Sequence, residues 1–308
     1  KARNAAPDWG YPAWRLGYAT FFTKRNFDHG LKLLREAKEL DPSNIFIKRS
    51  LCEALALVPQ RWDEAKAALE DLVETDDRLL SRAMFAEFLL AAFGDVEAAY
   101  IEFQKVLDGN PQTTVDFCAR AFTKMYYFED IIGAKADYEE AQAVSVGERR
   151  SARDMENDDL VIKSNLLIIS LAIDTRSNNL QDIYDSVIER HSPTGRNLID
   201  AILKLSNDNF GDSFGHFRNA LQLNSFELYE TYKGFLIFYL RLVERAGYGD
   251  RLLNGLQEDG LADKYWPVYS ALDAYFNGED KLLDVNPEVR GAASMIFHSL
   301  LGIKRMKT

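Results

Sequence analysis

Few residues in this chain have the types and spacings that catalysis or metal binding requires. None of the histidines has a second His, a Cys or a carboxylate at a metal-ligand spacing such as HExxH, and the cysteines do not form a CxxC pair. We therefore expect no metal and no cofactor. The four histidines and two cysteines are His29, His191, His216, His298, Cys52 and Cys118.

Nucleotide-binding signatures are also missing. The segment GYGDRLLNG, from Gly247 to Gly255, begins like a dinucleotide fingerprint, but Leu252 occupies the place of the third glycine and no strand precedes it. No Gly-rich phosphate loop ends in Lys-Ser or Lys-Thr, and the acidic run ARDMENDD has no spacing that implies an acid/base pair. We predict that the chain is not an enzyme; a cryptic site between its two halves is the alternative.

The composition is that of a globular protein, and it narrows the class of partner. The chain has 308 residues, 47% of them hydrophobic, and a net charge of −11. An acidic surface disfavours binding to nucleic acid or to an anionic membrane. We find no apolar run of about 18 residues and no signal peptide in KARNAAPDWG, and two cysteines indicate a reducing compartment. We expect a cytoplasmic protein and, since the first residue is Lys, a processed form or a domain of a longer chain.

The elements that would position binding residues repeat along the first half. Small residues recur every 34 or 35 positions, at Gly30, Ala65, Ala99 and Ala134. Positions i, i+4 and i+7 share one face of a helix, so a small residue there admits a neighbouring helix and larger ones fill the space beside it. The repeat predicts stacked pairs of antiparallel helices. Apolar residues follow each small residue at the fourth and seventh positions, namely Leu34, Leu69, Phe103 and Tyr138, then Ala37, Leu72, Val106 and Ala141.

The predicted ends of these helices agree with the same period. Asp28 and Asp63 stand near the start of second helices, where an acidic side chain suits the helix dipole. Pro42 and Pro111 follow second helices and stop them, because proline lacks an N–H and clashes with the preceding turn.

The first repeat resembles the tetratricopeptide repeat (TPR) family closely. Gly17-Tyr18 stands where the family has Leu-Gly. The resemblance covers roughly 8–146 and implies an all-α solenoid of about four helix pairs. The family's Trp, Tyr, Ala, Phe, Ala and Pro positions are occupied by Trp14, Phe21, Gly30, Leu34, Ala37 and Pro42.

The resemblance also implies a concave groove lined by the first helix of each pair. Phe22, Phe88 and Tyr126 would be apolar anchors, and Arg15 and Arg49 would pair with carboxylates. A slip of one residue in the register would instead turn the aromatic residues into the core. The family's site for chaperone tails needs Lys and Asn at two positions where this chain has Arg and Ala, so binding of that kind is not expected. The expected partner-binding residues are Arg15, Phe22, Phe46, Arg49, Met84, Phe88, Tyr126 and Tyr127.

A charged stretch follows the repeats. SVGERRSARDMENDD is polar and poor in apolar residues, which predicts a linker or long loop at 147–159. Residues 160–303 read as degenerate helical repeats with capping helices, the last beginning at Pro287 after Asn286. No alternating strand pattern is present.

Two functions follow as expectations. The first is a scaffold-like module that binds a peptide or a partner protein in the groove and does not bind nucleic acid or membrane; exposed apolar grooves also allow self-association. The alternative comes from the stretch that begins YWPVYSALDAYF, which resembles the closing helices of repeat regions in bacterial multidomain signalling ATPases. That resemblance implies the ligand-sensing region of a larger signalling or defence switch protein, whose ATPase or effector domain is not in this chain.

Overall fold

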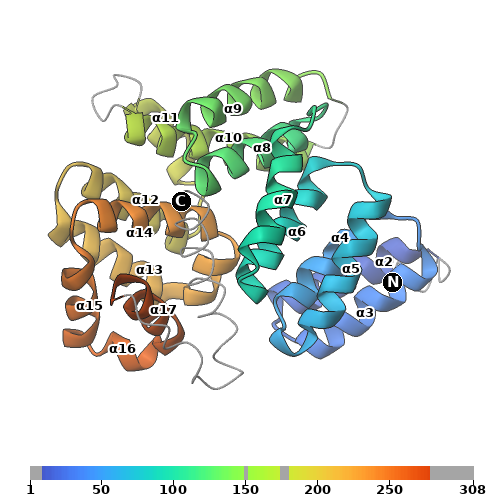
Figure 1. The fold of residues 1–308 in the computed structure, drawn as a ribbon, viewed down its shortest axis with the longest axis horizontal. Helices are drawn as coiled ribbons and strands as arrows, with labels where there is room; N and C mark the ends of the chain where they lie inside the picture. Colours follow the sequence, from blue (N-terminus) through green and yellow to red (C-terminus); the bar gives the residue numbers. More distant parts are fainter. Residues whose placement is uncertain (1–8, 149–151, 174–179, 278–308) are drawn as a thin grey trace. The chain divides into compact units, whose positions relative to one another are not determined.

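The computed structural model describes residues 9–148, 152–173 and 180–277. In these residues the chain forms helices joined by turns, with no strand, and most of the helices pack on a neighbour in the sequence (Figure 1). None of the described helices is both long enough and apolar enough to cross a membrane. The predicted last helix, with Asn286 and Pro287, lies outside the described residues.

The chain divides into two compact units within helix α7 (Val96–Leu107), between Glu102 and Phe103. This position differs from the expected boundary at 147–159. We refer to residues 1–102 as unit 1 and to residues 103–308 as unit 2.

In unit 1 each helix packs on the next one: α2 on α3, α3 on α4, α4 on α5 and α5 on α6, with α2 also touching α4. Besides the start of α7, the elements are α2 (Gly10–Tyr18), the π-helical turn η1 (Ala19–Thr23), α3 (Phe27–Leu40), α4 (Ile45–Ala56), the 3₁₀ turn η2 (Pro59–Arg61), α5 (Trp62–Thr75), α6 (Leu79–Phe88) and the π-helical turn η3 (Leu89–Phe93).

The repeating residues form the core, as their spacing predicted. Gly30 shows why a small residue is needed: a Cβ atom there would lie 2.6 Å from Cβ of Phe21 and 2.8 Å from its Cα, so α3 meets η1 backbone to backbone. The positions four and seven residues later are buried with it. All twelve repeat positions are buried, namely Gly30, Ala65, Ala99, Ala134, Leu34, Leu69, Phe103, Tyr138, Ala37, Leu72, Val106 and Ala141.

Side-chain caps fix where several helices begin. Asn26 accepts a hydrogen bond from the backbone N–H of His29 at the start of α3, and Asn44 accepts from Phe46 and Ile47 at the start of α4. Such caps satisfy backbone N–H groups that have no partner within the helix. Asp28 lies in the first turn of α3, as its position in the sequence predicted.

In unit 2 four helices contact one another in a cycle. Helix α8 contacts α10, α10 contacts α12, α12 contacts α14, and α14 contacts α8. After the end of α7, the elements are α8 (Thr114–Tyr127), α9 (Ile131–Ser145), α10 (Ala152–Ile173), α11 (Leu180–Ile188), α12 (Pro193–Ser206), α13 (Phe210–Glu230), α14 (Lys233–Arg245), α15 (Gly249–Glu258), α16 (Leu261–Lys264) and α17 (Trp266–Asn277).

The stretch predicted as a linker is mostly helical. From residue 152 onward it forms the first turns of α10, and only a short connection separates it from α9. Asp159 explains part of this difference: its carboxylate pairs with Lys163 at 3.0 Å and with Arg190 at 2.8 Å. Asp159, one of the charges that suggested an exposed loop, therefore lies on a helix and binds two neighbouring cations.

Candidate binding surface

A row of aromatic rings covers one side of α2 and η1. Trp9, Tyr11, Trp14, Tyr18 and Phe22 follow one another, with consecutive ring centroids 5.1, 5.0, 6.2 and 4.4 Å apart. Trp9 is 54% exposed, and Tyr11 and Tyr18 are each 40% exposed. We call these five residues the aromatic stripe. Three of its five rings are thus exposed to solvent.

The opposite side of α2 explains why the stripe faces outward. Gly17 is buried, and a Cβ atom there would lie 3.0 Å from Cβ of Leu33 and from the backbone nitrogen of Leu34. Helix α3 therefore covers the side of α2 that carries the small residues Ala13 and Gly17. Tyr18, which follows Gly17 in the sequence, thus stays on the surface.

Two hydrogen bonds hold parts of the stripe in place. Nε1 of Trp14 donates to Oγ of Ser50 on α4 at 2.8 Å, which fixes the indole although it is only partly buried. Arg15 is exposed; its Nη1 donates to Oη of Tyr11 at 3.3 Å, and its guanidinium carbon lies 5.9 Å from the centre of that ring. Arg15 thus places a positive charge within the stripe.

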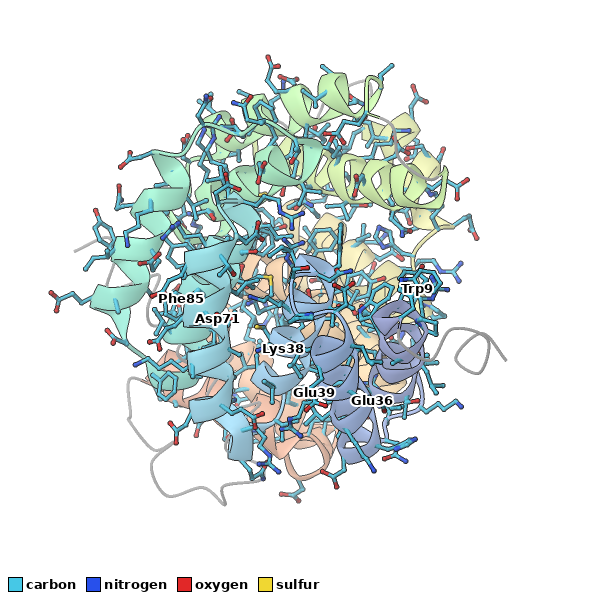
Figure 2. All side chains as sticks on the ribbon, turned by 90° about the vertical axis from the view of Figure 1, so that its right-hand side faces the viewer. Trp9, Glu36, Lys38, Glu39, Asp71 and Phe85 are labelled. Carbon is cyan, nitrogen blue, oxygen red and sulfur yellow. The ribbon has the colours of Figure 1, made fainter. Side chains whose placement is uncertain are left out.

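Another side of unit 1 carries charged side chains instead of aromatic rings. Figure 2 shows charged side chains on α3 and α5, among them Glu36, Lys38 and Asp71, with Trp9 at the edge of this face. The exposed ring of Trp9 therefore borders a surface of charged side chains.

Four of the eight expected binding residues keep some exposure. Phe22 belongs to the aromatic stripe, and Arg15 lies beside it on α2. Met84 is half-buried on α6. Phe46, at the start of α4, is 62% exposed, and the guanidinium carbons of Arg49 and Arg78 lie 5.9 and 5.4 Å from its ring centre.

Arg49 itself is buried, which corrects its expected place in an open groove. Its Nη2 donates to Oδ2 of Asp76 at 2.9 Å and to Oγ of Ser81 at 3.2 Å, and Arg78 donates to the other oxygen of Asp76 at 2.9 Å. Burial acts to raise the pKa of Asp76, but the hydrogen bonds from Arg78, Ser81 and Arg49 together lower it. The Arg49 guanidinium therefore joins α4 to α6 instead of awaiting a partner's carboxylate.

The expected exposure of three aromatic residues is also corrected. Phe88 is buried and meets Phe93 edge to face at 5.6 Å between ring centroids. In unit 2, Tyr127 stacks on Phe103 at 4.3 Å. Oη of Tyr126 donates to Asn165 of α10 at 2.7 Å in the core. These three side chains belong to helix packing, which was the alternative considered for the aromatic residues.

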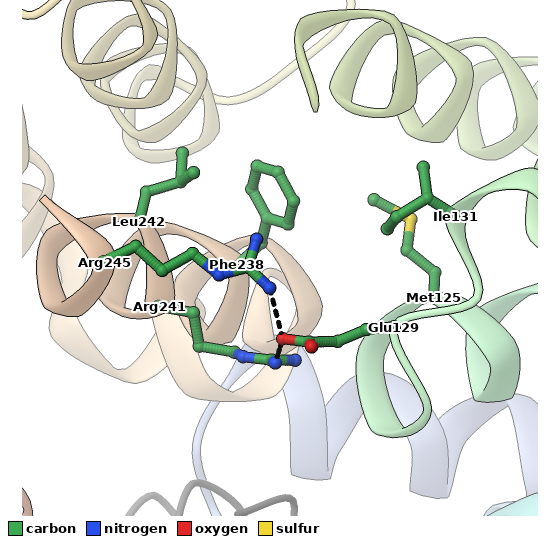
Figure 3. A pocket seen from close by; sticks show the side chains of 7 residues that line it. All are labelled: Met125, Glu129, Ile131, Phe238, Arg241, Leu242 and Arg245. Carbon is green, nitrogen blue, oxygen red and sulfur yellow. Dashed lines mark hydrogen bonds and ion pairs between the residues drawn. The ribbon is translucent and has the colours of Figure 1, made fainter. Parts of the chain in front are cut away.

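Unit 2 contains a charged cluster around a small cavity of about 20 Å³, room for one water molecule (Figure 3). Glu129, at the end of α8, binds Arg241 and also Nη2 of Arg245, the latter at 2.6 Å. Burial, and then the neighbouring Arg245, lowers the pKa of Arg241 to about 10. Two guanidinium groups of α14 thus hold one carboxylate of α8. Met125 and Phe238 line the apolar side of the cavity.

A buried serine and histidine in unit 2 have the separation of a nucleophile and its base, but their hydrogen bonds are structural. Oγ of Ser164 donates to the backbone carbonyl of Leu160 at 2.5 Å and lies 2.8 Å from Nε2 of His191. Nδ1 of His191 lies 3.3 Å from Oη of Tyr232. Because Ser164 gives its proton to its own helix, its oxygen accepts from the histidine. Both side chains are buried.

The two cysteines lie on helices of the described residues, whereas His298 lies outside them. Burial raises the pKa of the Cys52 thiol to about 12, which keeps it protonated and unreactive at neutral pH. Cys118 is half-buried. Within the described ranges, no group of three His, Cys, Asp or Glu side chains could hold a metal ion.

A wider recess opens between α9, α10 and α11, with a volume of about 490 Å³. It is open to solvent and has a mixed lining, so its shape selects no ligand. Its lining residues are Gln142, Lys163, Leu166, Asp182, Ile183 and Ser186.

The aromatic stripe was missed in the sequence because α2 is apolar on two sides. The spacing of Tyr11, Trp14 and Tyr18 places them on one helical face, but Ala13, Gly17 and Phe21 form a second one. Only the packing of α3 shows which face is covered. Comparison with known proteins adds no further guide: no protein-family model matches the chain, and a search of curated proteins found no match.

Proposed function

We propose that unit 1 is a TPR-like helical repeat that recognises a peptide segment of a partner protein through the aromatic stripe. The succession of helices from α2 to α6, each packed on the next, supports an α-solenoid. The buried small residues at the repeat spacing support the same assignment. The stripe replaces the open groove of Arg49, Phe88, Tyr126 and Tyr127 as the surface that would bind.

One observation carries this proposal: large aromatic side chains lie next to one another and remain exposed. From the exposed fractions of Trp9, Tyr11 and Tyr18, the exposed aromatic patch amounts to roughly 300 Å². Patches of that size on a folded protein are often binding sites. Trp, Tyr and Arg are also the residues that contribute most to binding energy at interfaces, and all three occur here.

The test is a selection from a displayed peptide library on the immobilised 308-residue chain. We expect the wild type to enrich a family of related peptides, and the Tyr11→Ala/Tyr18→Ala double variant to bind them at least about tenfold more weakly, because buried aromatic anchors each contribute about 2 kcal/mol or more. The control is Ile132→Ala, which removes an apolar side chain that is 78% exposed on α9 of unit 2; it should bind like the wild type.

Two outcomes would overturn the proposal. The first is that the wild type enriches no peptide above the double variant. The second is that the chain forms a dimer in sedimentation velocity and the double variant is a monomer, because the stripe would then be an interface between two copies.

A further inference from the structure

The dimensions of the aromatic stripe select the shape of the peptide. From Trp9 to Phe22 the stripe extends about 20 Å along α2 and η1, at about 1.5 Å per residue. Its five rings follow one another in a single row along α2 and η1. A helical ligand needs a groove that encloses one of its faces, whereas an extended ligand needs only a line of contacts.

The spacing of the two exposed tyrosine rings matches a polyproline II helix. Tyr11 and Tyr18 are seven residues apart and therefore about 10.5 Å apart along the axis of α2. A polyproline II helix rises about 9.3 Å over its three-residue turn. Prolines three residues apart in the ligand would thus lie over Tyr11 and Tyr18 in succession. Proline-rich segments bind aromatic surfaces in this way because they are already extended and lose little entropy.

The charge around the stripe selects acidic residues in the peptide. The chain has a net charge of −11, yet residues 10–26 contain Arg15, Lys24 and Arg25 and no acidic residue. Arg15 is exposed and lies between Tyr11 and Tyr18 in the sequence of α2. An acidic residue between the two prolines would meet its guanidinium in a charge-assisted hydrogen bond.

The stripe also has a hydrogen-bond donor for the backbone of such a ligand. A polyproline II chain has no internal hydrogen bonds, so its carbonyl groups accept from the surface that it binds. Oη of Tyr11 accepts its own hydrogen bond from Arg15 and retains its proton for donation. The hydrogen bond to Ser50 already orders the Trp14 indole, so less side-chain entropy is lost there when a ligand binds.

We propose that the aromatic stripe binds an acidic, proline-rich segment in the polyproline II conformation, with prolines three residues apart over Tyr11 and Tyr18 and an acidic side chain on Arg15. This inference rests on the proposed function, since it names the partner of the same surface.

The experiment measures the binding of three synthetic peptides to the chain. Isothermal titration calorimetry gives the affinities, and tryptophan fluorescence reports binding near Trp9 and Trp14. The first peptide is Pro-Glu-Pro-Pro-Glu-Pro-Pro-Glu-Pro with blocked ends. In the second every Glu is Lys, and in the third every Pro is Ala. We expect the first to bind at least about tenfold more tightly than either of the others. In Tyr11→Ala/Tyr18→Ala its binding should be lost, and in Ile132→Ala it should be unchanged.

Arg15→Glu tests the role of charge without removing an aromatic ring. This variant should prefer the Lys peptide over the Glu peptide, reversing the order found for the wild type. Circular dichroism checks that each variant keeps its helical content. The residue is exposed, so we expect no change in folding.

Failure of this inference differs from failure of the proposed function. Equal binding of the three peptides, or binding that the double tyrosine variant retains, would overturn the inference. If the peptide library yields ligands that need the stripe but contain no proline, the function stands and the polyproline ligand is wrong. If neither the library nor the synthetic peptides bind, both are wrong.

Discussion

His191 connects three helices of unit 2 through its two ring nitrogens. It lies between α11 and α12, beside Ser164 of α10 and beside Tyr232, which precedes α14. A neutral imidazole has one donor and one acceptor, which fits the two hydroxyl groups. Burial, and then the charge of Arg190, lowers the pKa of His191 to about 4. At neutral pH the ring is therefore uncharged, and its hydrogen bonds hold the helices together.

This residue predicts how the stability of unit 2 depends on pH. The unfolded chain binds a proton at His191 near pH 6.5 and the folded chain only near pH 4, so protons favour unfolding between these values. The free energy of unfolding should fall by up to about 3 kcal/mol from this residue as the pH drops from 6.5 to 4. Urea unfolding at several pH values, followed by circular dichroism, measures the effect.

The matched variant is His191→Gln, which keeps a donor and an acceptor but does not titrate. Its unfolding free energy should depend less on pH than that of the wild type, while the carboxylates contribute equally to both. Parallel curves for the two proteins would show that His191 is not the titrating group.

At the scale of elements, the contact between α3 and η1 depends on a single missing methyl group. An alanine at Gly30 would place its Cβ against the backbone of Phe21, which belongs to η1 and cannot rotate away. In α13, by contrast, a Cβ added to Gly215 would have no neighbour within 4 Å. The same substitution should therefore have opposite effects at the two sites.

We expect Gly30→Ala to lower the midpoint of thermal unfolding, because overpacking costs about 1–3 kcal/mol and exceeds the gain in helix propensity. Gly215→Ala should raise the midpoint, since about 1 kcal/mol of helix propensity is gained with no clash. Thermal unfolding monitored by circular dichroism compares the two variants with the wild type. A Gly30→Ala protein as stable as the wild type would contradict the close packing of α3 on η1.

The sequence predicted these elements better than it predicted the surface. The repeat positions were found because burial on a helix is a local, periodic pattern, and Gly30 and its three equivalents are all in the core. The partner of Arg49 was not found, because Asp76 lies 27 residues away and meets it only after α4, α5 and α6 have packed. The helical N-terminal part of α10 was missed because charge alone does not separate a solvated helix from a loop.

At the scale of the whole molecule, the two units differ in how far apart in the sequence their contacting helices lie. In unit 1 the contacts mostly join consecutive helices, as in a repeat array. In unit 2 the cycle of α8, α10, α12 and α14 needs a contact between its first and last members. A Cβ on Gly234 of α14 would lie 2.8 Å from Phe122 and 2.9 Å from Tyr126, so the two helices meet closely there. The cluster of Glu129 with Arg241 and Arg245 adds a charged contact between the same elements (Figure 3).

A variant of Glu129 tests whether this cluster holds α8 and α14 together. Glu129→Gln would leave Arg241, which is largely buried, without its charged partner, and should cost about 1.5–3 kcal/mol. Hydrogen exchange measured by mass spectrometry should become faster in α8 and α14. Asp259→Asn, which breaks the exposed pair with Arg218, is the control and should cost less than about 1 kcal/mol. Unchanged exchange in α8 and α14 of Glu129→Gln would contradict this assignment.

The cycle also has a consequence for the growing polypeptide. Glu129 and Arg245 are 116 residues apart, so the ribosome adds the second on the order of ten seconds after the first. Unit 1 has all of its neighbouring helices by then and can fold as it emerges. The contact of Phe122 and Tyr126 with Gly234, in contrast, cannot form until α14 has been synthesised. We therefore expect chaperones to bind the nascent chain during the synthesis of unit 2, before the contact between α8 and α14 can form.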